Sequence, residues 1–275
     1  MTPQQILDTP DLIAAGVAGD DKRREMHGTK TTFVRVLEIH VDAPAAALPA
    51  GTQAGEIRIV GVPASLESAV AAVKAAVAIA GEIPVTGFSV FDLQGLTEPL
   101  AEVSSALQAA GLTAVARLQI DSVTNPAEAA RAIHAAGLRL PTISVDIIAD
   151  DERMAICERV ADLQTTVGGF DAFAPLPRTI SITKPTTGYD DVKMVALARV
   201  MVANVQSIQV DWQLYGPKLA QVALTVGADD IDNVSAVDPG VLGTRRSPLE
   251  EIKGNITSAG LEPVERDALF KERQR

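Results

Sequence analysis

Cysteine is almost absent from this chain of 275 residues, which contains only Cys157. A single thiol cannot form an internal disulfide, and it cannot supply a cysteine-rich zinc site or an all-cysteine iron–sulfur site. Cys157 lies in the middle of a helical pattern over residues 152–160, so we expect a buried structural thiol. The cysteine count therefore excludes every site that needs several thiolates.

Aromatic residues and positive charge are also scarce. Phe, Trp and Tyr together make up 3% of the chain, which leaves no platform on which bases could stack. The 24 basic and 35 acidic residues give a formal net charge of -11. A surface of this sign repels phosphate backbones, and we therefore expect no nucleic-acid partner.

Long hydrophobic runs are missing as well. No stretch approaches the roughly 18 to 20 continuous apolar residues of a membrane-spanning helix, so we expect no membrane association. The first five residues carry no basic region followed by an apolar core, and so we expect no signal peptide. A chain with one cysteine and no signal peptide suits the cytoplasm, where thiols stay reduced, and we therefore expect a cytoplasmic protein.

What the chain does contain is a repeat of strand and helix patterns. Strand patterns begin near residues 31, 56, 83, 113, 140, 170, 208 and 228. The four starts at 56, 83, 113 and 140 are 27, 30 and 27 residues apart, close to the roughly thirty residues of a βα unit. Alanine-rich helical patterns lie between the strands, over residues 65–80, 98–110, 126–136, 151–166, 190–204 and 217–226.

This alternation predicts an α/β fold, a (β/α)8 TIM-type barrel with seven or eight parallel strands. A doubly wound open sheet is the competing fold, but no Gly-x-Gly-x-x-Gly turn follows the first strand. We expect a single barrel domain over residues 1–275. It comprises an N-terminal helical lead-in (1–30), the barrel (31–235) and a C-terminal extension with a helical tail (236–275).

Polar side chains at the ends of the strand patterns are the candidate site residues, because working groups in parallel barrels sit at the carboxyl ends of strands. We expect Asp92 and Gln94 to follow the strand pattern that starts at residue 83. The candidates for binding a ligand are His40, Arg117, Gln119, Asp146, Arg178, Lys184, Asp211, Gln213 and Asp230. These residues predict a polar, mostly acidic mouth that suits a small polar molecule; a solvated strand end remains the alternative for Asp211 and its neighbours.

Three carboxylates crowd together in the run Asp229-Asp230-Ile231-Asp232. Carboxylate oxygens suit Mg²⁺, so a metal site is one interpretation. Consecutive side chains of a strand alternate between its two faces, however, and at most two of these carboxylates can converge. We therefore expect no metal.

Two stretches, residues 168–176 and 197–232, resemble the radical SAM enzymes of the futalosine pathway of menaquinone biosynthesis, above all the aminofutalosine synthases. The second stretch includes Tyr215-Gly216-Pro217-Lys218 and Gly227-Ala228-Asp229-Asp230. The segments at 23–28 and 249–267 also look like their counterparts in that family. The resemblance implies a barrel whose first strand is followed by Cys-x3-Cys-x2-Cys, the motif that holds a 4Fe–4S cluster and thereby S-adenosylmethionine.

The sequence departs from the family pattern at that motif. Residues 38–45 read Glu-Ile-His-Val-Asp-Ala-Pro-Ala, without a cysteine. The glycine-rich segment that the resemblance implies after the fourth strand is replaced by Arg117-Leu118-Gln119-Ile120-Asp121. We therefore expect no cofactor, and in particular no 4Fe–4S cluster: a pseudoenzyme related to menaquinone biosynthesis that does not perform radical SAM chemistry.

Three functions remain open at this point. The first is a cluster-free barrel that binds a small polar molecule. The second is a non-radical enzyme in which Asp146, Asp211 and Asp230 do acid–base or metal-assisted work while Arg117, Arg178 and Lys184 hold an anionic substrate. The third is an accessory role, as a homodimer or as a heterodimer with a cluster-bearing homologue.

Overall fold

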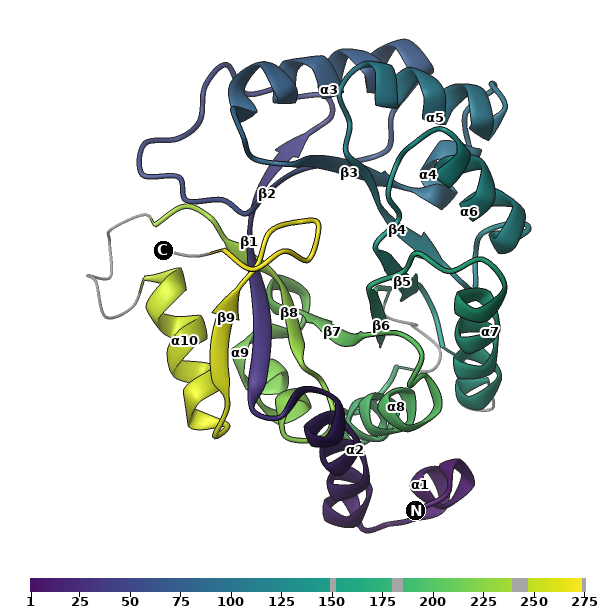
Figure 1. The fold of residues 1–275 in the computed structure, drawn as a ribbon, viewed down its shortest axis with the longest axis vertical. Coiled ribbons are helices and arrows are strands. Elements are labelled where there is room, and N and C mark those ends of the chain that lie inside the picture. Colours follow the sequence, from purple (N-terminus) through teal and green to yellow (C-terminus); the bar gives the residue numbers. More distant parts are fainter. Residues whose placement is uncertain (149–151, 180–184, 239–246, 274–275) are drawn as a thin grey trace.

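Eight parallel strands close into a barrel in the computed structural model, which describes residues 1–148, 152–179, 185–238 and 247–273. Each strand pairs with the next along the chain, and β1 closes the ring by pairing with both β8 and β2 (Figure 1). The predicted TIM-type barrel is confirmed. The strands are β1 (Lys30–His40), β2 (Glu56–Val60), β3 (Val85–Ser89), β4 (Ala114–Gln119), β5 (Thr142–Val145), β6 (Ala172–Pro177), β7 (Ser207–Asp211) and β8 (Asp230–Ser235).

Helices surround the barrel and begin where the sequence provides caps. The hydroxyl oxygens of Ser65 and Thr187 accept hydrogen bonds from backbone N–H groups in the first turns of α3 and α8, and Pro126 opens α6. The helices are α1 (Pro3–Asp8), α2 (Leu12–His27), α3 (Leu66–Ala80), α4 (Val90–Gln94), α5 (Leu100–Ala109), α6 (Pro126–Ala135), α7 (Arg153–Thr166), α8 (Gly188–Met201), α9 (Trp212–Leu224) and α10 (Pro248–Ser258).

The two faces of the barrel wall differ in polarity. On β2, Ile57 and Ile59 belong to the apolar core, while Glu56 and Arg58 line cavities within the barrel. Ile143 of β5 and Ile208 of β7 likewise join the core. The hydrophobic core therefore lies between the strands and the surrounding helices, and the barrel interior is polar and charged.

A ninth strand, β9 (Glu262–Glu265), extends the sheet beside the first residues of β1. Lys30 to Phe33 pair with β9, whereas Val36 to His40 pair with β2. β9 and β2 thus pair with different stretches of β1, and β9 lies at the end where the strands of the barrel begin. The sequence pattern indicates no strand here, because the segment is short, contains Pro263 and lacks apolar alternation.

Several element boundaries differ from the predicted ones. The strand pattern from residue 83 ends at Ser89, whose side chain caps α4, and so Asp92 and Gln94 are helical. Gln213 likewise lies in the first turn of α9, because Asp211 accepts the Leu214 N–H and starts that helix.

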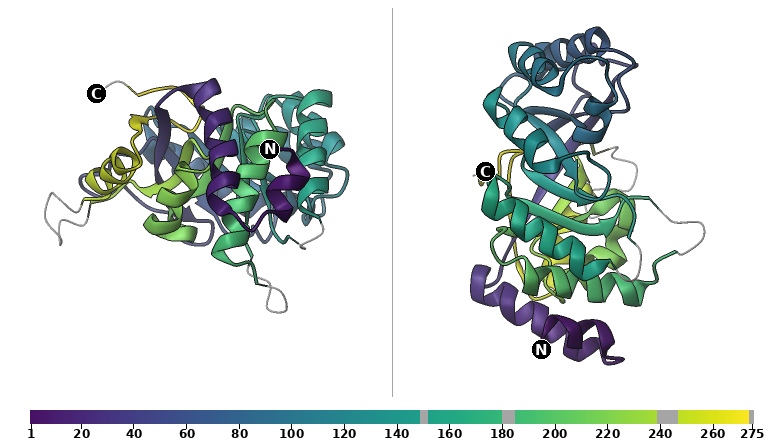
Figure 2. Two further views of the ribbon diagram at one scale, coloured as in Figure 1. Left: turned by 90° about the horizontal axis from the view of Figure 1, so that it is seen from below. Right: turned by 90° about the vertical axis from the view of Figure 1, so that its right-hand side faces the viewer.

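The N-terminal lead-in consists of two helices, α1 and α2. Figure 2 shows both at one edge of the molecule, alongside α8. The Lys193 ammonium of α8 donates to the Leu7 carbonyl at 2.6 Å and so joins α8 to α1. None of the helices in the described part of the chain is long and apolar enough to cross a bilayer.

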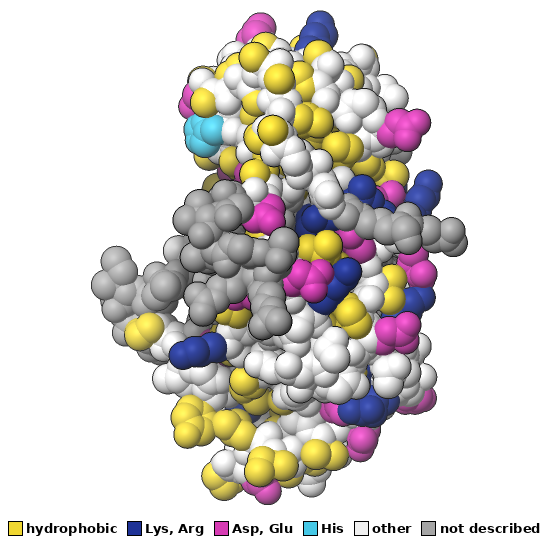
Figure 3. Space-filling view, turned by 90° about the vertical axis from the view of Figure 1, so that its left-hand side faces the viewer, with side chains coloured by type: hydrophobic (Ala, Val, Ile, Leu, Met, Phe, Trp, Pro, Cys, Tyr) yellow, Lys and Arg dark blue, Asp and Glu magenta, His cyan; other side chains and the backbone are white. Residues whose placement is uncertain are grey.

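The outer surface of α3 carries small apolar side chains beside two exposed charged residues, Glu67 and Lys74. Ala71, Val77 and Ala78 are exposed on this helix. In Figure 3 hydrophobic side chains gather over the upper part of the face shown, whereas charged side chains of both signs are frequent below. The charge of the protein is therefore unevenly distributed over this face.

Candidate functional site at the carboxyl end of the barrel

A fully paired ion network occupies the barrel interior around Arg58. The guanidinium donates to both oxygens of Glu56, at 2.7 and 2.9 Å, and to both oxygens of Asp232, at 2.8 Å each. Burial disfavours the charged form, but the two carboxylates raise the pKa of Arg58 well above its usual value. Because every charge in this network has a partner, we assign it a structural role.

Asp230 belongs to a second buried pair, at the opposite end of the barrel from the mouth. The sequence pattern predicts Asp230 among the ligand-binding residues, but it is the first residue of β8 and lies where the strands begin. Nε and Nη2 of Arg266 each donate to one Asp230 oxygen at 2.6 Å. Thr32 and Gln209 also donate to this carboxylate. The expected position at the mouth was therefore wrong, because the strand starts two residues later than the pattern suggests.

Arg178 and Asp211 meet at the mouth, where β6 and β7 end. Arg178 Nη2 donates to Asp211 Oδ2 at 3.0 Å, and the other oxygen of Asp211 accepts the Leu214 N–H. The Asp211 carboxylate is buried, whereas Arg178 remains half-buried. Gln213 is exposed on α9 and is not part of this pair.

Among the described cations of the mouth, Arg117 on β4 has the fewest hydrogen bonds. Its Nε is shielded from solvent and has no hydrogen-bond partner in the described part of the chain. Burial, followed by repulsion from Arg178 and Arg58, lowers the pKa of Arg117 to about 10. Gln119, two residues further on, is buried and accepts the backbone N–H of Phe91 at 3.4 Å. Arg117 therefore faces the interior with a shielded Nε that has no partner among the described residues, while Gln119 links β4 to α4.

Asp146 follows β5 and lies against Asp121, which follows β4. The Asp121 carboxylate accepts the backbone N–H groups of Asp146 and Ile147, both at 2.9 Å, and Ser122 Oγ donates to Asp146 at 3.1 Å. Burial and the nearby Asp121 charge raise the pKa of Asp146, although Ser122 and Arg117 act in the other direction. Asp146 is therefore a half-buried carboxylate whose ionised form is disfavoured.

This raised pKa predicts that Asp146→Asn increases the stability of the protein in a pH-dependent way. The raised pKa means that the contribution of Asp146 to stability is present below its unfolded pKa, near 3.9, and is lost as pH rises through the folded value. The neutral variant should therefore unfold at a slightly higher temperature than the wild type at pH 7 and at the same temperature near pH 3. Thermal unfolding across this pH range measures the difference, with exposed Asp162→Asn as the control. A lower midpoint for Asp146→Asn at pH 7 would refute the assignment.

Two further residues predicted to bind a ligand, His40 and Lys184, remain. His40 is exposed at the end of β1 and packs on Gly61, where an added Cβ would lie 2.7 Å from the imidazole Nε2. Its Nδ1 accepts the backbone N–H of Asp42 at 3.3 Å. Lys184 lies outside the described residues.

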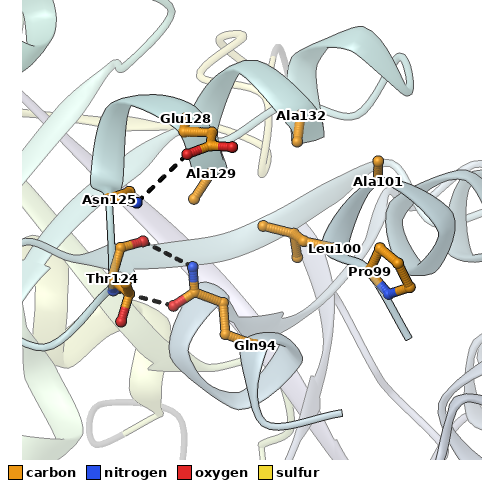
Figure 4. Close-up of a pocket in the computed structure, with 9 residues that line it drawn as sticks. All are labelled: Gln94, Pro99, Leu100, Ala101, Thr124, Asn125, Glu128, Ala129 and Ala132. Carbon is orange, nitrogen blue, oxygen red and sulfur yellow. Dashed lines mark hydrogen bonds between the residues drawn. The ribbon is translucent and has the colours of Figure 1, made fainter. Parts of the chain in front are cut away.

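Gln94 lies outside the barrel and not at its mouth. Its side-chain amide donates to the Thr124 carbonyl at 2.9 Å and accepts the Thr124 N–H at 3.1 Å (Figure 4). A cavity of about 320 Å³ lies beside this contact, with Leu100 and Ala129 in its wall. Gln94 therefore ties α4 to the segment that precedes α6.

The described residues offer little to a metal ion or cluster. Within residues 1–148, 152–179, 185–238 and 247–273, no group of three or more His, Cys, Asp or Glu side chains is arranged to hold a metal. Cys157 is buried inside α7, and its surroundings raise the pKa of the thiol to about 12. A 4Fe–4S cluster needs several thiolates, so the residues present do not fit this group.

Sequence reasoning missed Glu56, Arg58 and Arg266 as interior residues. The pattern Glu-Ile-Arg-Ile-Val of β2 does carry a signal, since its polar and apolar residues alternate. In a barrel whose outer face is covered by helices, such alternation places the charges inside. Arg266 has no comparable signal, because it follows a strand that the sequence does not reveal.

Comparison with known proteins links part of the chain to one protein family. Residues 170–275 match the family described as the CofH/MqnC C-terminal region. The resemblance inferred from the sequence is confirmed. The aminodeoxyfutalosine synthase of Thermus thermophilus is 32% identical over 206 residues, which are 63% of this chain and 55% of that protein.

A second group of relatives carries the name of a transferase. The 5-amino-6-(D-ribitylamino)uracil–L-tyrosine 4-hydroxyphenyl transferase of Methanothermobacter thermautotrophicus is 36% identical over 137 residues, or 44% of this chain and 36% of that protein. The chain thus spans about half, or less, of the length of these curated relatives.

Solved structures show the same fold. HydG, a maturase of the FeFe-hydrogenase, superimposes with a TM-score of 0.64 at 15% identity, covering 96% of this chain and 72% of HydG. Methylornithine synthase (PylB) gives 0.63 at 10% identity, covering 95% and 92% of the two chains.

Proposed function

We propose that this chain is a radical-SAM-like barrel that works without a 4Fe–4S cluster and binds a small anionic molecule at its mouth. One observation carries the first half of the proposal: the only cysteine, Cys157, is buried within α7, and none follows β1. Residues 41–55, between β1 and β2, supply no thiolate. Residues 170–275 nevertheless match the CofH/MqnC C-terminal region, and this match together with the missing thiolates supports a related barrel that lacks the donors for a cluster.

The second half of the proposal is supported by the charges of the mouth. Arg117 has a solvent-shielded Nε without a partner in the part of the chain that the structure describes, and Arg178, which lines the same cavity, is held by Asp211. Cations that are fixed by the fold and only partly neutralised suit a carboxylate or phosphate group. A non-radical enzyme remains the second candidate, because the raised pKa of Asp146 would let its carboxyl group hold a proton beside a bound anion.

Anaerobic reconstitution with iron and sulfide tests the cluster-free proposal. We expect no iron–sulfide absorbance in the visible region and no protein-bound iron after desalting, because three thiolates are needed for each cluster. A radical SAM protein with the three-cysteine motif serves as the positive control. Cys157→Ala serves as the matched variant and should behave as the wild type does. A stable visible chromophore that appears in the wild type would overturn the proposal.

A further inference from the structure

A small cavity inside the barrel lies next to Arg117. It has a volume of about 20 Å³ and is lined by Arg58, Arg117, Arg178, Ser144 and Asp232, among others. Space of this size holds about one water-sized atom. The cavity can therefore accept a single oxygen atom, and the rest of a larger molecule would have to lie in the mouth above it.

Two of the side chains around this cavity carry donors that have no hydrogen-bond partner among the described residues. Arg117 Nε and Ser144 Oγ are both shielded from solvent, and neither has a hydrogen-bond partner in the described part of the chain. Buried donors without an acceptor are rare in native proteins, since leaving them unpaired is costly. Arg58, in the same wall, contrasts with them, because its guanidinium is saturated by Glu56 and Asp232. The two orphan donors therefore mark a place for an acceptor.

The charge around the cavity favours an anionic acceptor over a neutral one. After burial, the largest influences on the Arg117 guanidinium are repulsion by Arg178 and by Arg58, and attraction by Asp92 and Asp146 is weaker. An added negative charge would relieve this repulsion and pair with the one guanidinium of the group that lacks a carboxylate partner among the described residues.

We propose that the cavity receives one oxygen of a carboxylate or phosphate group, with Arg117 Nε and Ser144 Oγ as its hydrogen-bond donors. The proposal rests on the anion-binding function argued above and specifies how that ligand is held. The anionic end of the molecule enters the barrel first, and its remaining atoms stay in the mouth near Arg178.

Thermal unfolding and calorimetric titration with three probes test this site: formate, inorganic phosphate and chloride, at constant ionic strength and pH. We expect formate or phosphate to bind and to raise the unfolding midpoint of the wild type. Arg117→Gln should weaken that binding about tenfold or more, and Ser144→Ala should weaken it less, as expected for a charged and a neutral hydrogen bond. Arg24→Gln, which removes an exposed charge on α2, should bind as the wild type does.

A second readout is independent of any ligand. Without anion, Arg117→Met should raise the unfolding midpoint, because it removes a half-buried guanidinium whose Nε lacks a partner among the described residues. An arginine with a purely structural role would give a lower midpoint. Equal affinity of the wild type and Arg117→Gln would overturn the inference while leaving the proposed function intact. A wild type that responds to none of the three probes would instead contradict anion binding itself. A response to chloride as large as that to formate would also overturn the oxyanion assignment.

Discussion

Replacing Arg58 with methionine is expected to lower the free energy of unfolding by about 3–5 kcal/mol, the loss typical of breaking a buried ion pair by removing one partner. The guanidinium holds two buried carboxylates at once, those of Glu56 and Asp232, through four hydrogen bonds of 2.7 to 2.9 Å. Methionine fills similar space but leaves both negative charges inside the barrel. Urea unfolding followed by circular dichroism measures the loss.

A rescue variant separates charge from packing at this position. If the unpaired carboxylates cause the loss, Glu56→Gln and Asp232→Asn in the Arg58→Met background should recover most of the stability, because the neutral groups cost less to bury. The rescue also keeps the test informative if Arg58→Met alone does not fold. An Arg58→Met protein as stable as the wild type would show that the network contributes nothing.

The same network predicts how acid affects the protein. Burial raises the pKa of Asp232, but the charge and hydrogen bonds of Arg58 outweigh it and leave that pKa below its usual value. A depressed pKa contributes stability above the unfolded value of about 3.9, and this contribution is lost as pH falls through the folded value. The difference in the free energy of unfolding between the wild type and Arg58→Met should therefore become smaller in strong acid.

Arg266→Met is the second substitution with a large expected effect, again a loss of about 3–5 kcal/mol in the free energy of unfolding. Arg266 is fully buried, donates to both Asp230 oxygens at 2.6 Å and stacks over the Phe270 ring at 3.8 Å. Its loss leaves Asp230 unpaired and also removes a cation–π contact. Denaturant unfolding gives the magnitude, and hydrogen exchange of β9 shows whether this strand loosens first.

An exposed ion pair on the same two segments supplies the control. Lys30, at the start of β1, pairs with Glu272 beyond β9, and both side chains are largely exposed. Lys30→Ala should cost less than about 1 kcal/mol, because solvent screens such pairs. Equal losses for Lys30→Ala and Arg266→Met would mean that burial of the Asp230 pair does not matter.

The architecture was predictable because it depends on repeats within the sequence. Strand starts about thirty residues apart, with alanine-rich helical patterns between them, are enough to indicate a TIM-type barrel. The buried helical position of Cys157 was predictable for a similar reason, since its neighbours follow a helical period. The expected absence of a cluster remains a prediction that rests on the cysteine count.

The site was less predictable, because it depends on boundaries shifted by a few residues. Two residues of difference at the start of β8 move Asp230 from the mouth to the far end, and a cap at Ser89 moves Gln94 out of the barrel. Arg117, Asp146, Arg178 and Asp211 do lie near the carboxyl ends of their strands. Their pairing could not be predicted, since it depends on which neighbour each long side chain reaches.

The position of β9 has a consequence for synthesis on the ribosome. β1 leaves the ribosome early, but the first residues of this strand gain their second neighbour only when Glu262–Glu265 has emerged. Until Arg266 has been synthesised, the Asp230 carboxylate lacks the guanidinium that it pairs with in the folded protein. Contacts so distant in sequence form late and slowly. This edge of β1 therefore stays unpaired in the nascent chain until residue 265 has been synthesised.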